Sequence, residues 1–407
     1  MKEFTLALAV FTLVAGTTTP SLWRHVLSSS RFLPQSLSNA SSPVKAQIAF
    51  DKNMIFPGYV VDAATPTNIF VIDANGEKPE LQLSKDDRSS HPVWSPDGRR
   101  IAYVHERDDS SRKWEETYEI SVMQADGKDP KHLAFIPGAP KTIAWSPKGE
   151  TLAFDGFVPG PWEGNISFLE SSIYLLQVDG DKTPKLLVKD GSSPSWSPDG
   201  SQVAYTCVSK ANPGKRKNSF CLIATDGHSK PHVFRENAWN PIWSPDGQKI
   251  VFLETIKKRV QLMVCNPDGS NLIRLTDGHH DVQSAAWSPD SKFIAFTEKR
   301  PMEDEVIQTG PLHSAQVPRV FLVDIDGSSR IPLGEKESLW CHDVSWSPDG
   351  KFIAGICASG IRNPSTRRQR AADSIFRISV TDFKGKPKIV ARDGVGQAVF
   401  SPVMNSQ

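Results

Sequence analysis

The chain has 407 residues, with 47 Lys and Arg against 46 Asp and Glu. This balanced charge gives no long-range attraction to nucleic acid or to an anionic membrane, so both are excluded as bulk partners. The 31 Pro and 27 Gly residues favour many short strands joined by turns, and the length is compatible with one large β domain.

The N-terminal region has the pattern of an export signal. Lys2 precedes an apolar run at 4–15, and small residues follow it. This pattern predicts a secretory signal peptide at 1–19, followed by a flexible Ser/Asn-rich linker at 20–45. We therefore expect a periplasmic or secreted protein. The alternative is an uncleaved membrane anchor that extends to Trp23, although a bilayer span needs about 20 apolar residues.

A motif reading Trp-Ser-Pro-Asp-Gly, or a close variant, recurs at intervals of about 50 residues, which indicates a repeat architecture. Pro presets the turn, Asp can hydrogen-bond the turn backbone, and Gly accepts positive φ. Because the motif recurs in every repeat, we interpret its Ser and Asp as structural rather than catalytic or calcium-binding. The motif starts at Trp94, Trp145, Trp196, Trp243, Trp287 and Trp346, and the series ends at Phe400-Ser401-Pro402.

Each repeat also contains a second β-rich run that ends in an Asp-Gly turn, as at 68–76 and 119–127. An apolar run lies between the two signatures, and a short strand follows the second. Four short strands separated by tight turns predict one blade of a β-propeller.

The six complete motifs would suggest six blades, but the chain ends favour seven. Residues 47–50 match the second strand of a repeat that lacks its first strand, and residues 393–402 match a first strand alone. Pairing the two would leave no unpaired strand edge. We predict an all-β, seven-bladed β-propeller of four-stranded antiparallel blades over 46–403, closed by the C-terminal strand, with six blades as the alternative.

These two signatures, and the terminal Ser-Pro strand, resemble the TolB-type β-propeller family over residues 47–402. The resemblance implies an exported, non-enzymatic protein-binding scaffold with a protein partner in the cell envelope. TolB proteins carry an α/β domain ahead of a six-bladed propeller. This chain departs from that pattern, since only about 46 residues precede the first strand and seven blades are expected. We expect a monomer.

The connections predict where a ligand binds. In a four-stranded antiparallel blade, the first and third connections lie on one rim, and the second connection and the link to the next blade lie on the other. The first rim carries only tight turns, whereas the second carries loops of variable length, which is where binding is usually found. The long insertions are at 105–118, 155–171, 209–219, 299–318 and 358–373.

Basic residues cluster in several of these variable loops. We interpret them either as solvated loops or as a sector that docks an acidic protein or a polyanionic glycan. The cluster includes Lys215, Arg216 and Lys217, then Lys257, Lys258 and Arg259, and finally Arg362, Arg367, Arg368 and Arg370.

The links between blades place a second candidate group near the axial mouth. Histidines beside Asp could bind a metal, but there is no HxH or HExxH spacing, and ordinary polar lining is the alternative. We expect no cofactor. The group comprises His91, Trp239, Asn240, His279, His280, Asp281, Trp340, His342 and Asp343.

Two pairs among the five cysteines are spaced as cross-strand neighbours. Cys207 with Cys221, and Cys341 with Cys357, could be disulfides in an exported protein or small buried side chains. Cys265 is left over.

Enzymatic readings have less support. The sequence contains no G-x-S-x-G elbow and no Walker or dinucleotide glycine motif. The alternative to a protein-binding scaffold is a polysaccharide-binding protein, or a metal-assisted polysaccharide lyase or glycosidase acting in the channel. That chemistry would require the residues at 279–281 or 342–343.

Overall fold

The computed structural model describes residues 46–53, 67–107, 118–136, 140–159, 169–209, 217–301, 316–333, 340–358, 373–380, 388–391 and 398–401. The chain separates into two compact units, Met1–Pro43 and Val44–Gln407, and every described residue belongs to the second. The signal peptide and linker predicted at 1–45 lie outside the described residues and stay predictions. Within the described ranges, no helix is long and apolar enough to cross a membrane.

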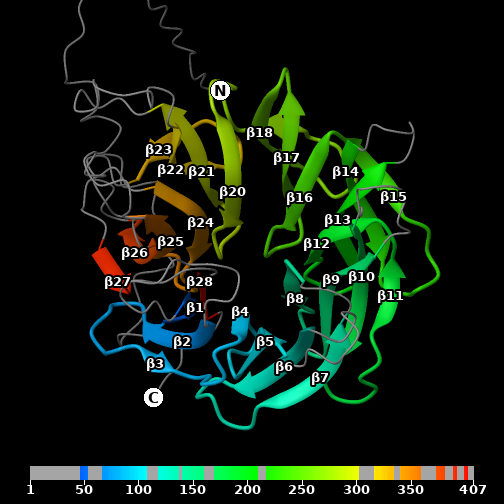
Figure 1. Ribbon diagram of the computed structural model, residues 1–407. Helices are drawn as coiled ribbons and strands as arrows, with labels where there is room; N and C mark the ends of the chain where they lie inside the picture. The colour runs from blue at the N-terminus through cyan, green and yellow to red at the C-terminus, as the bar shows by residue number, and fades with distance from the viewer. Residues whose placement is uncertain are drawn as a thin grey trace, which may run out of the picture. The chain divides into compact units, whose positions relative to one another are not determined.

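The described strands form seven four-stranded antiparallel sheets, which are the blades of a propeller (Figure 1). Blade 1 combines both ends of the chain: β28 (Ala398–Phe400), β1 (Gln47–Asn53), β2 (Thr67–Asp73) and β3 (Leu81–Gln82). Blades 2 to 4 follow in chain order: β4 (Ser89–Trp94), β5 (Arg100–Glu106), β6 (Tyr118–Gln124), β7 (Lys131–Ile136); β8 (Ile143–Trp145), β9 (Thr151–Pro159), β10 (Leu169–Gln177), β11 (Lys185–Val188); β12 (Gly191–Trp196), β13 (Gln202–Ser209), β14 (Lys217–Ala224), β15 (His232–Glu236). Blades 5 to 7 complete the set: β16 (Ala238–Trp243), β17 (Ile250–Ile256), β18 (Arg259–Cys265), β19 (Ile273–Arg274); β20 (Asp281–Trp287), β21 (Phe293–Pro301), β22 (Gln316–Asp324), β23 (Arg330–Pro332); β24 (Trp340–Trp346), β25 (Phe352–Ala358), β26 (Asp373–Ser379), β27 (Lys388–Ala391).

Blade 1 closes the ring, as the sequence predicts. Strand β28 pairs antiparallel with β1, with Phe400 opposite Ile48, and the Ser401 N–H donates to the Gln47 carbonyl at 2.7 Å. Strand β28 also contacts β24 of blade 7 and β4 of blade 2. The prediction of seven blades is confirmed, and the alternative of six is wrong because the two half-repeats complete one sheet.

The motif serine and aspartate hold the first hairpin together in five of the seven blades. Ser95 Oγ donates to Asp97 Oδ1 at 2.6 Å and accepts the Arg100 N–H at 2.9 Å. Gly98, at φ 65°, donates its N–H to the Ser95 carbonyl. A carboxylate that accepts such bonds is stabilised in its charged form. The same serine bonds recur at Ser197, Ser244, Ser288 and Ser347.

Four of the six motif tryptophans hydrogen-bond to the blade before their own. The indole N–H of Trp145 donates to the Val93 carbonyl at 3.1 Å, and that of Trp287 donates to the Ile242 carbonyl at 3.0 Å. Trp196 and Trp346 make the same kind of bond.

Blades are buried on both faces. Ala49, Ile69 and Val71 of blade 1 pack in one cluster with Trp94 and Tyr103 of blade 2. Because both faces of the middle strands are covered, these strands carry nearly continuous apolar runs instead of alternating ones.

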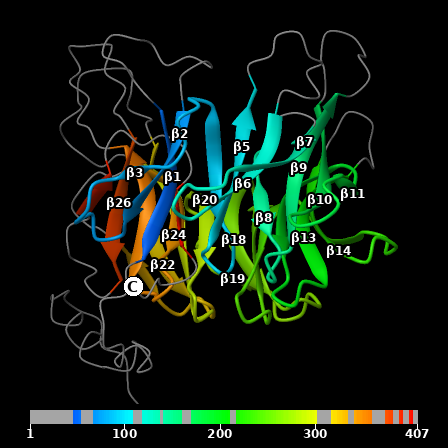
Figure 2. The same cartoon turned by 90° about the horizontal axis from the view of Figure 1, so that it is seen from below.

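The strands run between two opposite rims (Figure 2). We call the rim with the first and third connections of each blade the turn rim, and the opposite one the variable rim. Most second connections, including those at 108–117 and 302–315, lie outside the described residues. Blade 5 differs, because its β17–β18 connection is only Lys257 and Lys258 and is fully described.

We predict that Trp287→Phe lowers the free energy of unfolding by about 1–2 kcal/mol more than Trp243→Phe does, because only Trp287 loses a hydrogen bond. The two side chains are matched in burial, with exposed fractions of 7% and 8%. Among the described residues, Trp243 Nε1 has no hydrogen-bond partner. Urea unfolding measures the difference, and equal losses would contradict a stabilising role for the indole bond.

Candidate functional site

The innermost strands start at the variable rim and carry β-bulges there. The register of the first two strands shifts at the bulge in blades 2, 4 and 5. At these bulges His91, Ser193 and Asn240 have φ of 55°, 53° and 50°. A bulge turns a side chain away from the regular pleat. These residues are therefore set apart from the alternating pattern of their strands.

Each bulge is fixed by a side chain of the preceding blade. The His91 N–H donates to Asp51 Oδ2 at 3.0 Å, and the Ser193 N–H donates to Asp155 Oδ2 at 3.3 Å. Asn240 makes the equivalent bond to Thr206 Oγ1 at 2.9 Å. All three acceptors are buried. Contacts between neighbouring blades therefore hold His91, Ser193 and Asn240 in the left-handed conformation.

Asp155 accepts two further bonds, from the Lys141 and Thr142 N–H groups at 2.8 Å each. Burial raises the pKa of Asp155, and the backbone N–H groups partly offset this rise. The carboxylate is therefore a structural acceptor and is not presented to a ligand.

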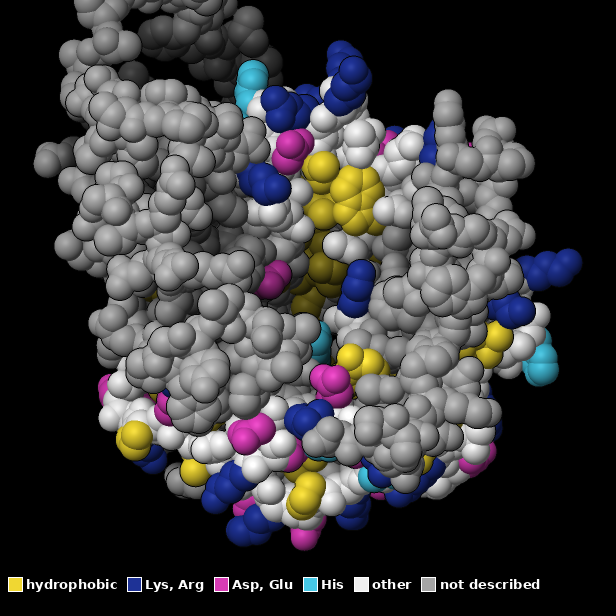
Figure 3. All heavy atoms as spheres, viewed as in Figure 1, with side chains coloured by type: hydrophobic (Ala, Val, Ile, Leu, Met, Phe, Trp, Pro, Cys, Tyr) yellow, Lys and Arg dark blue, Asp and Glu magenta, His cyan; other side chains and the backbone are white. Residues whose placement is uncertain are grey.

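Three of the predicted mouth residues lie near the start of innermost strands, His91 in β4 and Trp239 and Asn240 in β16. His91 is half-buried, with Nδ1 2.9 Å from Ser90 Oγ. Trp239 is half-buried against the core shared by blades 5 and 6, and Asn240 is exposed. Figure 3 shows that this face is hollowed at the centre, with hydrophobic side chains on the wall of the hollow.

The residues at 279–281 lie beside the β17–β18 hairpin. Asp281 Oδ2 is 3.3 Å from Arg259 Nη1, and Asp281 Oδ1 accepts the Val260 N–H at 2.8 Å. The His280 carbonyl accepts Gln261 Nε2 at 3.5 Å, and His279 is exposed. The structure therefore brings Asp281 of the predicted axial group into contact with Arg259 of the predicted basic group.

We call Lys257, Lys258 and Arg259 the basic hairpin. Ile256 pairs with Arg259, so the loop has two residues, and both have positive φ, 49° and 66°. This is the φ pattern of a type I′ turn, which strongly prefers Asn-Gly. The left-handed conformation costs an L-residue roughly 1–2 kcal/mol. Lysine is thus an unfavourable choice at both positions.

All three side chains of the basic hairpin are exposed. Figure 3 shows Lys and Arg side chains gathered at the tip of β17 and β18, next to the central hollow. Within the described part of the chain, neither Lys257 nor Lys258 forms an ion pair or a side-chain hydrogen bond. The tip therefore carries two positive charges that no described residue neutralises.

Other predicted site residues are placed less completely. Trp340 and His342 lie in β24, where the structure describes only their backbone, and Asp343 is exposed in the same strand. Lys217 is exposed at the start of β14. The remaining basic residues, Lys215, Arg216, Arg362, Arg367, Arg368 and Arg370, lie outside the described residues.

The mouth residues do not form one cluster. In the described ranges, no hydrogen bond or ion pair joins His91, Asn240 and Asp281 to one another. The same ranges contain no group of three or more His, Cys, Asp or Glu placed to hold a metal ion. The expectation that the protein uses no cofactor stays a prediction.

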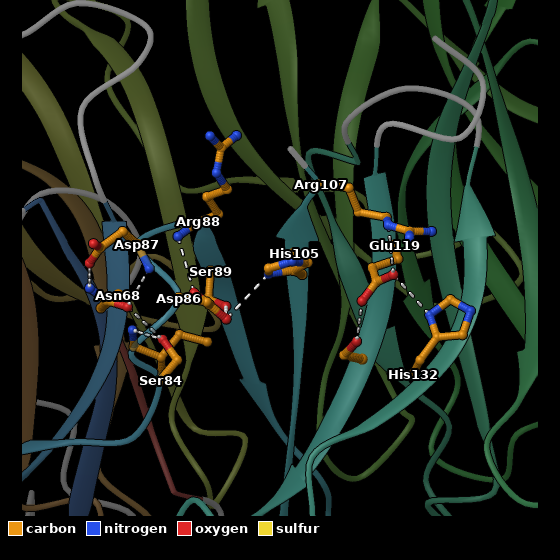
Figure 4. Close-up of polar contacts among 12 residues, drawn as sticks. Asn68, Ser84, Asp86, Asp87, Arg88, Ser89, His105, Arg107, Glu119 and His132 are labelled. Atoms are coloured by element: carbon orange, nitrogen blue, oxygen red, sulfur yellow. Dashed lines mark hydrogen bonds and ion pairs between the residues drawn. The ribbon is translucent and has the colours of Figure 1, made fainter. Parts of the chain in front are cut away.

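Blade 2 contains a polar cluster that sequence reasoning did not predict. Asp86 Oδ2 is 3.2 Å from His105 Nδ1 and accepts Ser89 Oγ at 2.7 Å. On the next strands, Glu119 Oε2 is 3.1 Å from His132 Nδ1. Figure 4 shows the two histidines directed at their carboxylates. The pairing of His105 with Glu119 across β5 and β6 could have been found by aligning the predicted strands, but the contacts of Asp86 and His132 could not.

The contact between Asp86 and His105 shifts the pKa of both groups. The hydrogen bond to Asp86 raises the pKa of His105, against an opposing effect of burial. For Asp86, burial alone would raise the pKa, but the bonds from His105 and Ser89 lower it below its usual value.

A neighbouring network explains why this cluster lies where it does. The Asn68 side chain, which is fully buried, donates to Asp87 Oδ1 at 2.6 Å and accepts the Asp87 N–H at 3.0 Å (Figure 4). Asp87, two residues before the innermost strand β4, has φ 60°. The polar residues of this region therefore organise the link from blade 1 to blade 2, which favours a structural role.

The structure joins Cys207 in β13 to Cys221 in β14 by a disulfide, with 5.9 Å between the Cα atoms. Cys341 and Cys357 face each other in the register of β24 and β25. Cys265 is buried and free, and burial raises the pKa of its thiol to about 11. Such a thiol is a poor nucleophile at neutral pH.

Residues 46–348 match the TolB beta propeller domain. The chain is 30% identical over 105 residues to the Tol-Pal system protein TolB of Alcanivorax borkumensis, which covers 26% of this chain and 23% of that protein. It is 32% identical over 65 residues to the uncharacterized peptidase YuxL of Bacillus subtilis, covering 16% of this chain and 9% of the peptidase. The chain thus spans less than a quarter of either relative.

Among solved structures, a puromycin-hydrolyzing peptidase of Mycobacterium tuberculosis superposes with a TM-score of 0.60 at 14% identity, over 85% of this chain and 52% of the peptidase. At this identity the similarity concerns the fold alone. It agrees with the propeller built from the strand pairings.

We predict that His105→Gln costs more stability at pH 5 than at pH 8.5. His105 has a raised pKa when folded, so its contribution is present below its unfolded pKa of about 6.5 and is lost as the pH rises through the folded value. Asp86 has a lowered pKa, so its contribution is lost as the pH falls below about 4. The pair therefore contributes most between about pH 4 and 6.5, by less than about 1 kcal/mol because both groups are partly exposed to solvent. Urea unfolding at the two pH values measures it, and a cost independent of pH would contradict the ion pair.

We also predict two disulfides under oxidising conditions, Cys207–Cys221 and Cys341–Cys357. Intact mass and peptide mapping without reductant, after alkylation, should find only Cys265 as a free thiol, and only once the protein is unfolded. Alkylation of Cys221 in the native protein would contradict the first bridge, and alkylation of Cys357 the second.

Proposed function

The chain belongs to the TolB beta propeller domain family, and from this we propose that it is an exported, non-enzymatic scaffold that binds a cell-envelope protein at its variable rim. The difference between the two rims carries this proposal. In every complete motif the serine hydroxyl accepts a backbone N–H within a turn of the turn rim, as in Ser95 and Ser197. On the variable rim, side chains instead stand on bulges that the preceding blade holds in place, or carry positive charges that no described residue neutralises.

Rigidity of the mouth supports a binding role. Asp51, Asp155 and Thr206 hold the bulges of the following blades. Side chains on such a framework lose little conformational entropy when they are bound, and preorganisation of this kind strengthens binding.

Binding is favoured over catalysis by the engagement of Asp281. Its two carboxylate oxygens accept from Arg259 and from the Val260 N–H. A general base must reach a substrate proton, whereas this carboxylate is committed to holding the hairpin. Polysaccharide binding or cleavage in the channel is the alternative that the experiments below separate.

A glycine double variant tests the mouth. His91→Gly/Asn240→Gly removes two mouth side chains where glycine suits the positive φ, so the backbone is not strained. We expect its capture of a partner, by cross-linking in envelope extracts, to fall about tenfold relative to the unmodified protein, the loss of roughly 1.4 kcal/mol of binding.

Asp129→Gly/Asn271→Gly is the matched control, because both residues have positive φ, 50° and 53°, and are exposed, but lie on the turn rim. Its capture should be unchanged. Equal capture by all three proteins, or equal loss in the control, would contradict binding at the mouth. Turnover of polyuronides, measured with and without divalent metal, would instead support the enzymatic alternative.

A further inference from the structure

We infer that the basic hairpin is a preformed docking tip for a short acidic peptide segment of the partner protein. The inference rests on the proposed function and names the chemistry of the contact. It is carried by the combination of strain, exposure and uncompensated charge at Lys257 and Lys258.

The turn does not require these residues. Both lysines have φ values that Asn-Gly adopts at lower cost. No side-chain contact in the described ranges offsets this strain, because neither lysine forms an ion pair or a side-chain hydrogen bond there. An unfavourable conformation without internal compensation points to a role outside the fold.

The pairing of β17 with β18 and the contacts of Asp281 hold the tip in place. Strands β17 and β18 pair without a break from Ile250 opposite Cys265 to Ile256 opposite Arg259. Asp281 then clamps the base of the turn through Arg259 and the Val260 N–H. The two ammonium groups are therefore presented on a rigid stem.

The charge balance of the surroundings identifies the partner. Arg259 is paired with Asp281, whereas Lys257 and Lys258 form no ion pair within the described ranges. The two positive charges at the tip itself match a pair of carboxylates. A long polyanion would also meet Asp277 and Asp281, whose side chains are 46% and 29% exposed.

The neighbouring surface suits a peptide. Trp239, from the adjacent strand, is half-buried, and hydrophobic side chains line the hollow beside the tip (Figure 3). A peptide can place apolar side chains there while its carboxylates meet the lysines. Aromatic side chains are favourable anchors in such contacts.

The test uses fluorescence anisotropy with labelled peptides that contain adjacent Asp or Glu residues flanked by Leu and Trp. Matched peptides carry Asn or Gln instead. The variant Lys257→Asn/Lys258→Gly removes both charges and installs the residues the turn prefers. The control Lys148→Asn/Lys230→Asn removes two exposed lysines from the turn rim.

We expect the unmodified protein and the control to bind the acidic peptides about five- to tenfold more tightly than the amide peptides at low salt, a preference that high salt reduces. The hairpin variant should lose this preference. Its thermal midpoint should rise by about 2–4 °C, because strain is relieved, so the loss of binding could not be attributed to misfolding.

Three results would overturn the inference. These are no acidic preference in the unmodified protein, a preference retained by the hairpin variant, or an equal loss in the control. Tighter binding of polygalacturonate than of the acidic peptides would assign the tip to a glycan and reject the peptide. If the hairpin variant still captures the envelope partner fully, only this inference fails. If the unmodified protein captures no partner that depends on the mouth, the proposed function fails.

Discussion

The ring depends on the pairing of the short strand β28 with β1. Without it, β1 would present a row of unpaired backbone groups next to blade 7, and such an edge pairs readily with other chains. Phe400 takes the place of the motif tryptophan and is buried with Phe50 and Ile356. Its N–H reaches Ser345 Oγ of blade 7 at 3.4 Å. The degenerate last motif thus performs the packing role of the complete ones.

Closure also explains how the two rims acquired different roles. In a closed ring each blade has fixed neighbours, so side chains such as Asp51 and Asp155 can be buried as acceptors for the next blade. A buried carboxylate is tolerated only when its hydrogen bonds are satisfied. The cost of burying these groups is offset by N–H groups that the bulges would otherwise leave without partners. Fixed bulges at one rim and repeated turns at the other are two results of the same constraint.

Sequence reasoning predicted the part of this structure that repeats. The spacing of the motif tryptophans and the unmatched ends at 47–50 and 393–402 were enough for the blade number and for ring closure, because each depends on local pattern alone. The indole bond of Trp287 to blade 5 was missed, since a backbone acceptor has no signature in sequence.

The site was predictable only in outline. His91 and Asn240 were selected for their position near the mouth, but their bulges depend on Asp51 and Thr206, which lie 40 and 34 residues earlier. The strain at Lys257 and Lys258 could have been suspected, because a two-residue loop without Asn or Gly is unusual between strands. The contact of Asp281 with Arg259 could not be predicted, because it depends on how blade 5 packs against the link that follows it.

The central claim is that this propeller binds its partner through the variable rim and uses the turn rim as scaffold. Hydrogen–deuterium exchange of the protein with and without its cross-linked envelope partner tests it most directly. The account predicts slower exchange at 237–242 and 256–260 on complex formation, with the turns at 95–100 and 197–202 unchanged. Protection confined to those turns would contradict it.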